Sequence, residues 1–168
     1  LRTFYVGALA KAKQHVSKNS VPKKKSINVH AVQENFSVLT GVLKDLEIPE
    51  CKIYISDTAE ERAKEMLGDF ATTDLFAIAP GANWPGKRWP VPKYKELLQK
   101  VAHRFEGIVV LGTDNDLDKD VFNIEQMDLR AIDLRGKTNL QEASAVLSKA
   151  RVFLGNDSGL GHIAAGVG

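Results

Sequence analysis

Short apolar runs alternate with amphipathic stretches along most of this chain, and this alternation constrains the fold more than any other feature. The apolar runs lie at 53–55, 75–79, 108–111, 131–134 and 152–154. They lack the strict polar and apolar alternation of a strand with one face in water, so we expect strands that are buried on both faces. Such strands, separated by helices, form parallel sheets. The sequence therefore predicts an α/β fold, a Rossmann-like parallel sheet flanked by helices.

The stretches between the apolar runs have the spacing of helices. Apolar residues recur every three or four positions from Val32 to Leu46, which predicts an amphipathic helix over 31–46. We expect Asp57 or Thr58 to cap the next helix. Further helices are predicted at 57–67, 93–105, 117–127 and 140–150, and one more after residue 158.

Composition excludes several classes of protein. The 168 residues are 43% hydrophobic and 26% charged, which is typical of a soluble globular protein with a core. No apolar run approaches the roughly 18 residues of a membrane span. The one cysteine, Cys51, cannot form an internal disulfide, so we expect a cytoplasmic protein. Because the chain starts at Leu1 and stops at Gly168 inside a predicted helix, we expect a fragment of a longer protein.

Positive charge is concentrated at the start of the chain. Seven lysines and arginines precede the first acidic residue, Glu34, whereas residues 34–168 hold 16 basic and 21 acidic residues. This is typical of a solvated connector, around residues 17–26. A second interpretation is peripheral contact with anionic lipid headgroups. Nucleic-acid binding is not indicated, because aromatic residues do not alternate with these cations and no known nucleic-acid module appears.

The strand-to-helix turns are the places to look for chemistry, because ligands of parallel sheets bind beyond the carboxyl ends of the strands. The turn at 79–90 reads APGANWPGKRWP and holds two adjacent cations, Lys87 and Arg88. The spacing from Gly81 to Lys87 is similar to that of a phosphate-binding P-loop. However, Arg88 replaces the Ser or Thr whose hydroxyl holds Mg²⁺, and Pro85 has no backbone N–H to donate to a phosphate. An ordinary P-loop NTPase is excluded. Lys87 or Arg88 stays a candidate anion contact, and a solvated surface turn is the alternative.

A small polar turn at 155–162, GNDSGLGH, opens the last predicted helix. Backbone amides and the positive end of a helix dipole make such a turn a site for a pyrophosphate. His162, one turn into the helix, would donate a hydrogen bond to a phosphate or a leaving oxygen. The alternative is structural, with Asp157 or Ser158 as an N-cap and the glycines allowing close packing.

Two further turns are weaker candidates. Asp114 and Asp116 follow the run at 108–111, where they would accept hydrogen bonds from ribose hydroxyls or cap a helix. The polar turn at 134–140 would meet a nucleobase through its backbone, or supply Thr138 or Asn139 as an N-cap.

These turns, in this order, resemble glycosyltransferase family 9, whose best-known members are the ADP-heptose:lipopolysaccharide heptosyltransferases. The resemblance rests on APGANWPGKRWP, VVLGTDND and LRGKTNLQEASAVLSKARVFLGNDSGLGHIAAGVG, and less specifically on VHAVQENFSVLTGVL. It implies a GT-B fold, in which two Rossmann-like domains face each other and the second holds most of the donor. Residues 1–28 would then be the end of the first domain and a basic connector. Residues 29–168 would be a linker helix and the C-terminal, donor-binding half, truncated.

The resemblance also implies a set of donor-binding residues: Asn83, Lys87, Asp116, Thr138, Asp157, Ser158, Gly159 and His162. In it, Lys87 and Asn83 meet the phosphates, and the turn at 157–162 holds the diphosphate and the nearby sugar. Asp116 binds the ribose, although some members carry the longer Glu, and Thr138 lies in the adenine pocket. Asn83 stands where known members have Thr. The family's catalytic base is an Asp that would precede Leu1, so we assign no catalytic residue within the chain.

The implied function is that of an inverting glycosyltransferase. It would move a heptose from an ADP-sugar to a lipid-anchored saccharide, the inner core of lipopolysaccharide, with no cofactor and no metal. It would act in the cytoplasm, at the inner face of the inner membrane if the basic segment contacts lipid. The alternatives are a family 9 transferase with another donor sugar or acceptor, and a non-catalytic module that binds a nucleotide sugar. Without the base, we expect residues 1–168 alone to be inactive.

Overall fold

Four parallel strands form one sheet in the computed structural model, in the order β3-β2-β1-β4. The strands are β1 (Leu75–Ala79), β2 (Gly107–Val110), β3 (Ala131–Asp133) and β4 (Ala150–Gly155). The structure describes residues 52–72, 74–115 and 123–168, all within the unit Cys51–Gly168. The predicted α/β fold with a Rossmann-like parallel sheet is confirmed. The predicted helix at 31–46, the division at residue 28 and the basic segment lie outside the described residues.

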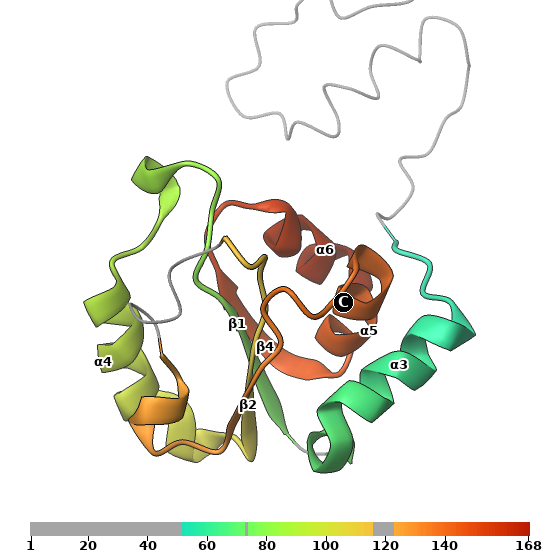
Figure 1. Ribbon diagram of the computed structural model, residues 1–168, viewed down its shortest axis with the longest axis horizontal. Coiled ribbons are helices and arrows are strands. Elements are labelled where there is room, and N and C mark those ends of the chain that lie inside the picture. The colour runs from blue at the N-terminus through green and yellow to red at the C-terminus, as the bar shows by residue number, and fades with distance from the viewer. Residues whose placement is uncertain (1–51, 73, 116–122) are drawn as a thin grey trace, which may run out of the picture. The chain divides into compact units, whose positions relative to one another are not determined.

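Helices cover both faces of the sheet (Figure 1). On one face lie α3 (Asp57–Leu67), α5 (Leu140–Leu147) and α6 (Gly159–Val167), and on the other lies α4 (Val91–Val101). Short 3-10 turns complete the described part: η2 (Gly68–Thr72), η3 (Pro85–Lys87), η4 (Ala102–Arg104) and η5 (Glu125–Met127). None of the helices in the described ranges is long and apolar enough to cross a bilayer.

The two central strands are buried along their whole length, as their uninterrupted apolar sequences predict. Because successive side chains point to opposite faces, Leu75 and Ala77 join the core under α3 and α5, whereas Phe76 and Ile78 join the core under α4. The outer strands β3 and β4 are only partly buried. The sheet is therefore anchored by β1 and β2, and each face has its own apolar cluster.

The apolar run at 53–55 is not a strand, which corrects the sequence prediction. Both sides of β1 are already paired, and Ile55 packs instead against the cluster under α3 and α5. The amide of Ile53 donates to the carbonyl oxygen of Gly166 at 3.0 Å. Ile53 and Ile55 thus pack against the unit without joining a ladder, whereas Tyr54 is exposed.

The N-cap of α3 is Ser56, and not Asp57 or Thr58. Its side chain accepts a hydrogen bond from the amide of Ala59 at 3.2 Å. Asp57 lies in the first turn, where a negative charge interacts favourably with the helix dipole. The sequence prediction was wrong by one or two residues, because Ser, Asp and Thr are all good N-caps.

Two other helices differ from prediction at their ends. α4 starts at Val91 and not at residue 93, because Pro92 fits the first turn, where no amide donor is required. α5 begins after Asn139, which forms a reciprocal capping box with Glu142. It ends at Leu147, and Ala150 already belongs to β4. Of the predicted helix at 117–127, only the last residues are described, and Glu125–Met127 form a 3-10 turn.

The strand order places a crevice between β1 and β4. The chain moves outward from β1 through β2 to β3, and then returns to the opposite side of β1 as β4. At such a reversal, the loops after the two neighbouring strands separate and leave room for a ligand beyond their carboxyl ends. The loops in question are those that follow Ala79 and Gly155.

Candidate functional site

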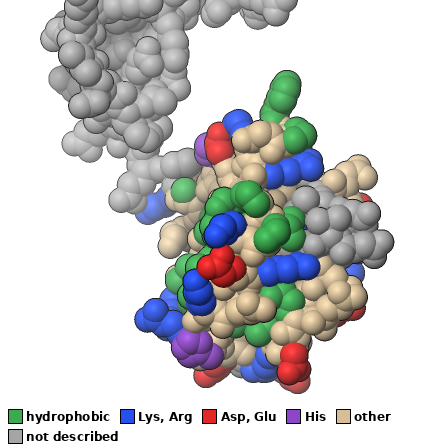
Figure 2. All heavy atoms as spheres, turned by 90° about the vertical axis from the view of Figure 1, so that its left-hand side faces the viewer, with side chains coloured by type: hydrophobic (Ala, Val, Ile, Leu, Met, Phe, Trp, Pro, Cys, Tyr) green, Lys and Arg blue, Asp and Glu red, His purple; other side chains and the backbone are tan. Residues whose placement is uncertain are grey.

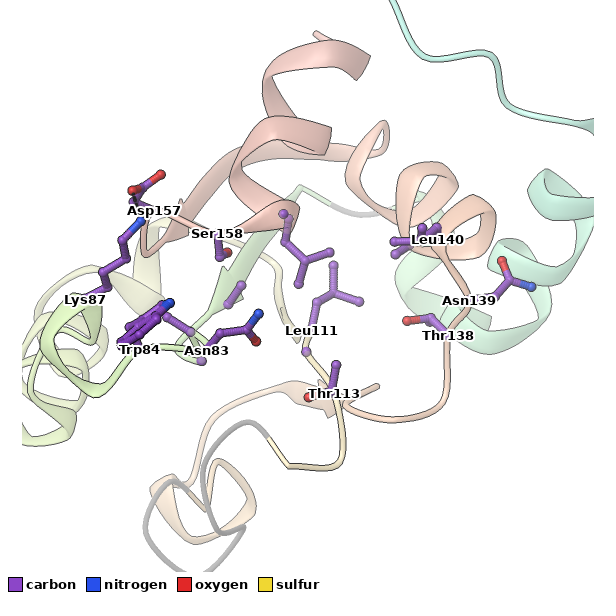
Figure 3. A pocket seen from close by; sticks show the side chains of 17 residues that line it. Asn83, Trp84, Lys87, Leu111, Thr113, Thr138, Asn139, Leu140, Asp157 and Ser158 are labelled. Atoms are coloured by element: carbon purple, nitrogen blue, oxygen red, sulfur yellow. Dashed lines mark hydrogen bonds and ion pairs between the residues drawn. The ribbon is translucent and has the colours of Figure 1, made fainter. Parts of the chain in front are cut away.

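A cavity of about 670 Å³ opens at the carboxyl end of the sheet (Figure 3). Its volume is typical of a site for a small organic ligand, for which about 300 to 1,000 Å³ is usual. The loops that follow β1, β2, β3 and β4 all contribute to its wall. Six of the predicted donor-binding residues line it: Asn83, Lys87, Thr138, Asp157, Ser158 and Gly159.

A cation and a carboxylate meet at one end of the cavity. Lys87 Nζ lies 2.5 Å from Asp157 Oδ2, so the loop after β1 and the turn after β4 are joined there (Figure 3). The hydrogen bond and the charge of Lys87 hold the pKa of the Asp157 carboxyl below its usual value. Both side chains are largely exposed, so the pair adds little to stability, and an incoming anion can compete for the ammonium group.

The second cation of this loop has a structural role. Arg88 Nε donates to the carbonyl oxygen of Ala82 at 2.7 Å, and its amide donates to that of Pro85 at 3.1 Å. The amide of Lys87 donates to the carbonyl oxygen of Trp84 at 2.9 Å. The sequence left Lys87 and Arg88 as equal candidates for an anion contact. The structure puts Lys87 on the cavity wall, whereas Arg88 closes the loop on itself.

Asn156 ties the two loops together, and sequence analysis did not single it out. Its buried amide nitrogen donates to the carbonyl oxygens of Pro80 at 2.7 Å and Gly81 at 3.1 Å. Its oxygen accepts from the amide of Trp89 at 2.9 Å and from the hydroxyl of Tyr94 at 3.2 Å. A polar residue directly after a predicted apolar strand was the available signal, because such a side chain needs partners if it is buried.

The start of α6 forms the part of the wall next to the loop after β1. Gly159 and Leu160 line the cavity there, and Ser158 occupies the N-cap position without a capping bond from its side chain. The positive end of the helix dipole and the first amides of the helix therefore lie at the cavity. Gly161 allows the close packing of this turn, since a Cβ there would lie 3.3 Å from the carbonyl oxygen of Asn156.

The other end of the cavity is more apolar. Leu111 and Leu140 line it together with the hydroxyl residues Thr113 and Thr138. In Figure 3, Thr138 and Leu140 lie across the cavity from Lys87 and Trp84. An apolar wall with a few polar groups is the usual lining for a flat organic ring.

A buried ion pair fixes the turn that carries Thr138. Arg135 is 1% exposed, and its Nη2 lies 2.6 Å from Asp133 Oδ2. Burial opposes ionisation of Asp133, but the hydrogen bonds and charge of Arg135 outweigh it and hold the pKa of the Asp133 carboxyl below its usual value. Gly136 adopts a left-handed φ of 69° and donates its amide to the carbonyl oxygen of Gly112 at 2.9 Å. A side chain at Gly136 would also collide with Asp114.

Two predicted residues are not placed on the cavity wall. The side chain of His162 is 82% exposed, and its Nε2 lies 4.0 Å from Asp157 Oδ1. Asp116 lies outside the described residues, so its assignment to a ribose stays a prediction. Within the described ranges, no group of three or more His, Cys, Asp or Glu side chains could hold a metal ion.

Residues 3–168 match the family described as glycosyltransferase family 9 (heptosyltransferase). Among curated proteins, lipooligosaccharide heptosyltransferase 2 of Haemophilus ducreyi is 30% identical over 141 residues, which are 75% of this chain and 39% of that protein. Lipopolysaccharide heptosyltransferase 2 of Salmonella typhimurium is 30% identical over 108 residues, or 60% of this chain and 31% of that protein. The chain thus spans about a third of the length of these relatives.

Two solved structures share the fold. A family 9 glycosyltransferase from Veillonella parvula has a TM-score of 0.75 at 23% identity, over 88% of this chain and 43% of that chain. The structure of E. coli ADP-heptose lps heptosyltransferase II has a TM-score of 0.59 at 25% identity, over 75% of this chain and 39% of that chain. The sequence match over residues 3–168 and the shared fold agree, and the chain belongs to glycosyltransferase family 9.

Proposed function

We propose that the intact protein binds an ADP-sugar in this cavity and transfers its sugar, a heptose, to the inner core of lipopolysaccharide. The observation that carries the proposal is the meeting of Lys87 and the start of α6 at the switch point of the sheet. An exposed cation and a helix N-terminus are two groups that favour a diphosphate. The relatives named heptosyltransferases support the choice of sugar and acceptor.

Lys87 and the first turn of α6 would stabilise the departing nucleoside diphosphate. In an inverting displacement, an acceptor oxygen forms a bond to the anomeric carbon while the bond from that carbon to the phosphate oxygen breaks. The acceptor's proton passes to a base, which the family resemblance places outside residues 1–168. Negative charge grows on the diphosphate as the bond breaks, and fixed positive groups at that position lower the barrier. No metal or cofactor is part of this proposal.

The other wall residues divide between the two ends of the ligand. Leu111, Leu140 and Thr138 would cover the adenine, since they form the more apolar end of the cavity. Asn83 and Ser158 would donate to phosphate oxygens between the ends. Asp157 would accept hydrogen bonds from sugar hydroxyls, because a carboxylate repels a phosphate but suits a hydroxyl. The ribose would fall to Asp116.

The test is calorimetric titration of the intact protein with ADP, GDP and UDP. We expect ADP to bind, and Lys87→Ala to weaken it by about 1.5 to 3 kcal/mol, the range for a hydrogen bond to a charged group. Lys93→Ala is the matched control, because Lys93 also forms an exposed ion pair, with Glu96, but lies on α4 away from the cavity. Unchanged ADP affinity in folded Lys87→Ala protein would contradict the phosphate role.

Transfer and location are separate parts of the proposal. We place the protein in the cytoplasm, with residues 1–28 as the end of the first domain and a basic connector. If that connector contacts anionic lipid, the protein acts at the inner face of the inner membrane. We expect purified residues 1–168 to be inactive, because loss of a general base costs about 10² to 10⁴ in rate. Product from that chain would contradict the placement of the base.

An intact protein that binds ADP-sugars without transfer would be a non-catalytic module, and transfer of another sugar would make it a family 9 transferase with a different donor.

A further inference from the structure

Trp84 presents an unpacked aromatic ring at the cavity. It is 72% exposed and lies directly before η3, on the cavity wall. Trp89, five residues later in the same loop, is 39% exposed and packs edge-on against Tyr94 with ring centroids 4.9 Å apart. The loop therefore buries part of one indole against the core and leaves the other largely in water. Leaving so much apolar surface in water forgoes the stabilisation of burial, which a ligand at the cavity would recover.

The loop that carries Trp84 is held on both sides. The carbonyl oxygen of Trp84 accepts a hydrogen bond from the amide of Lys87, and Arg88 Nε donates to the carbonyl oxygen of Ala82 across the turn. The same loop is fixed to the turn after β4 by Asn156. The indole is thus offered from a preorganised backbone, which lowers the entropic cost of binding a ligand against it.

The neighbours of Trp84 are suited to hydroxyl groups. Asn83 lies beside it in the chain, and Lys87 reaches from the same loop to Asp157 (Figure 3). A carboxylate accepts hydrogen bonds, and an amide both donates and accepts them. On the face of the molecule that carries α4, other hydrophobic side chains also reach the surface among lysines and arginines (Figure 2). Trp84 differs from those side chains because it lines the cavity, together with the polar residues Asn83, Lys87 and Asp157.

We infer that the indole of Trp84 is a stacking surface for the pyranose ring of a sugar substrate. The inference rests on the proposed function and adds to it the residue that orients and selects the sugar. A pyranose has faces of C–H groups and a rim of hydroxyls, so the indole covers a face while Asp157 accepts hydrogen bonds from the rim. The nucleoside end of the cavity, at Thr138 and Leu140, lies across from Trp84, and this favours a sugar over a base as its partner (Figure 3).

The test compares Trp84→Ala and Trp84→Phe in the intact protein. Calorimetry with ADP and with ADP-heptose separates the sugar contribution from the nucleotide contribution, and kinetics give the KM of the acceptor saccharide. If the donor sugar stacks on the indole, Trp84→Ala weakens ADP-heptose binding about tenfold and leaves ADP affinity unchanged. If the acceptor sugar stacks there, donor affinity stays the same and the acceptor KM rises by a similar factor. Trp84→Phe keeps most of the effect in either case, because it retains an aromatic face.

Tyr54→Ala is the matched control, since Tyr54 is 80% exposed but does not line the cavity. Thermal unfolding of all variants is expected to match the unchanged protein. Equal losses for ADP and ADP-heptose in Trp84→Ala would overturn the inference, because the ring would then serve the nucleotide. No change in donor affinity or acceptor KM would overturn it as well. Failure of the unchanged protein to bind ADP would instead overturn the proposed function, and the inference with it.

Discussion

The side-chain amide of Asn156 donates to the carbonyl oxygen of Pro80 at 2.7 Å, across 76 residues of sequence. With its three other hydrogen bonds, this side chain holds the loop after β1 against the turn after β4. These loops carry Lys87 and Asp157, so the geometry of the cation and the carboxylate depends on one buried amide. The site is therefore sensitive to a residue that does not line the cavity.

Asn156→Ala is expected to destabilise the protein by about 1 to 3 kcal/mol, because it leaves buried polar groups of the loop without a partner. It should also weaken ADP binding, since Lys87 is no longer held at the cavity. Urea unfolding and calorimetry measure the two effects. Asn123→Ala is the control, because the side chain of Asn123 accepts a hydrogen bond from the amide of Glu125 within its own turn. Wild-type stability in Asn156→Ala would show that the loop is held by other contacts.

Asp157→Asn is expected to favour the binding of ADP over that of the ADP-sugar. Without the carboxylate, Lys87 is no longer paired, and the phosphates of ADP meet its full charge, so ADP should bind several-fold more tightly. The ADP-sugar should gain less or lose affinity, because the acceptor for its hydroxyls is weakened. Titration with both ligands at one ionic strength measures the difference. Equal gains for the two ligands would remove Asp157 from the sugar contact.

Acidification should selectively weaken the turn that Asp133 and Arg135 hold. The pKa of the Asp133 carboxyl is lower in the folded protein than in the unfolded chain, so the unfolded chain binds more protons as the pH falls. The stabilisation is complete above the ordinary pKa of about 3.9 and is lost as the pH falls through the lower, folded value.

Asp133→Asn tests this directly. It removes one partner of a buried pair and should cost about 3 to 5 kcal/mol at neutral pH. The difference from the unchanged protein should shrink as the pH falls from about 3.9 through the lower, folded pKa, because the unchanged carboxyl is then protonated too. Urea unfolding over this range is the measurement, with the exposed Asp69→Asn as the control. A difference that does not vary with pH would mean that the ion pair is not the cause.

Replacing Lys23, Lys24 and Lys25 by Gln should lower binding of the intact protein to vesicles that contain phosphatidylglycerol. Each cation near an anionic surface contributes about 1 kcal/mol, and salt screens the attraction. Replacing the same number of lysines on α4, Lys93, Lys95 and Lys100, is the matched control. Co-sedimentation with the vesicles at low salt measures the binding of each variant. Equal binding by both triple variants would leave the segment as a solvated connector, and ADP affinity should be the same in either case.

The central strands and the loops around the cavity were both predictable from the sequence. The central strands were predictable because Leu75–Ala79 is buried on both faces and carries apolar side chains throughout. The loops around the cavity were predictable because Lys87 and Asp157 follow strands that end at the same edge of the sheet.

Features that depend on distant partners were not predictable in the same way. Whether Asn156 faces water or is buried depends on carbonyl oxygens 75 and 76 positions away. The buried state of Arg135 depends on how the turn after β3 folds back toward Asp133. His162 has the right spacing for the site, but the rotation of α6 leaves its side chain in solvent. Local pattern does not contain the long-range geometry that decides these cases.

The hydrogen bond from the amide of Ile53 to the carbonyl oxygen of Gly166 ties the end of α6 to the segment that precedes α3. One end of this helix forms the cavity wall at Gly159, and the other end is fastened to the segment that enters the unit. Nine helical residues span about 13 Å. The cavity wall at Gly159 and the segment that carries Ile53 are therefore linked through one short helix.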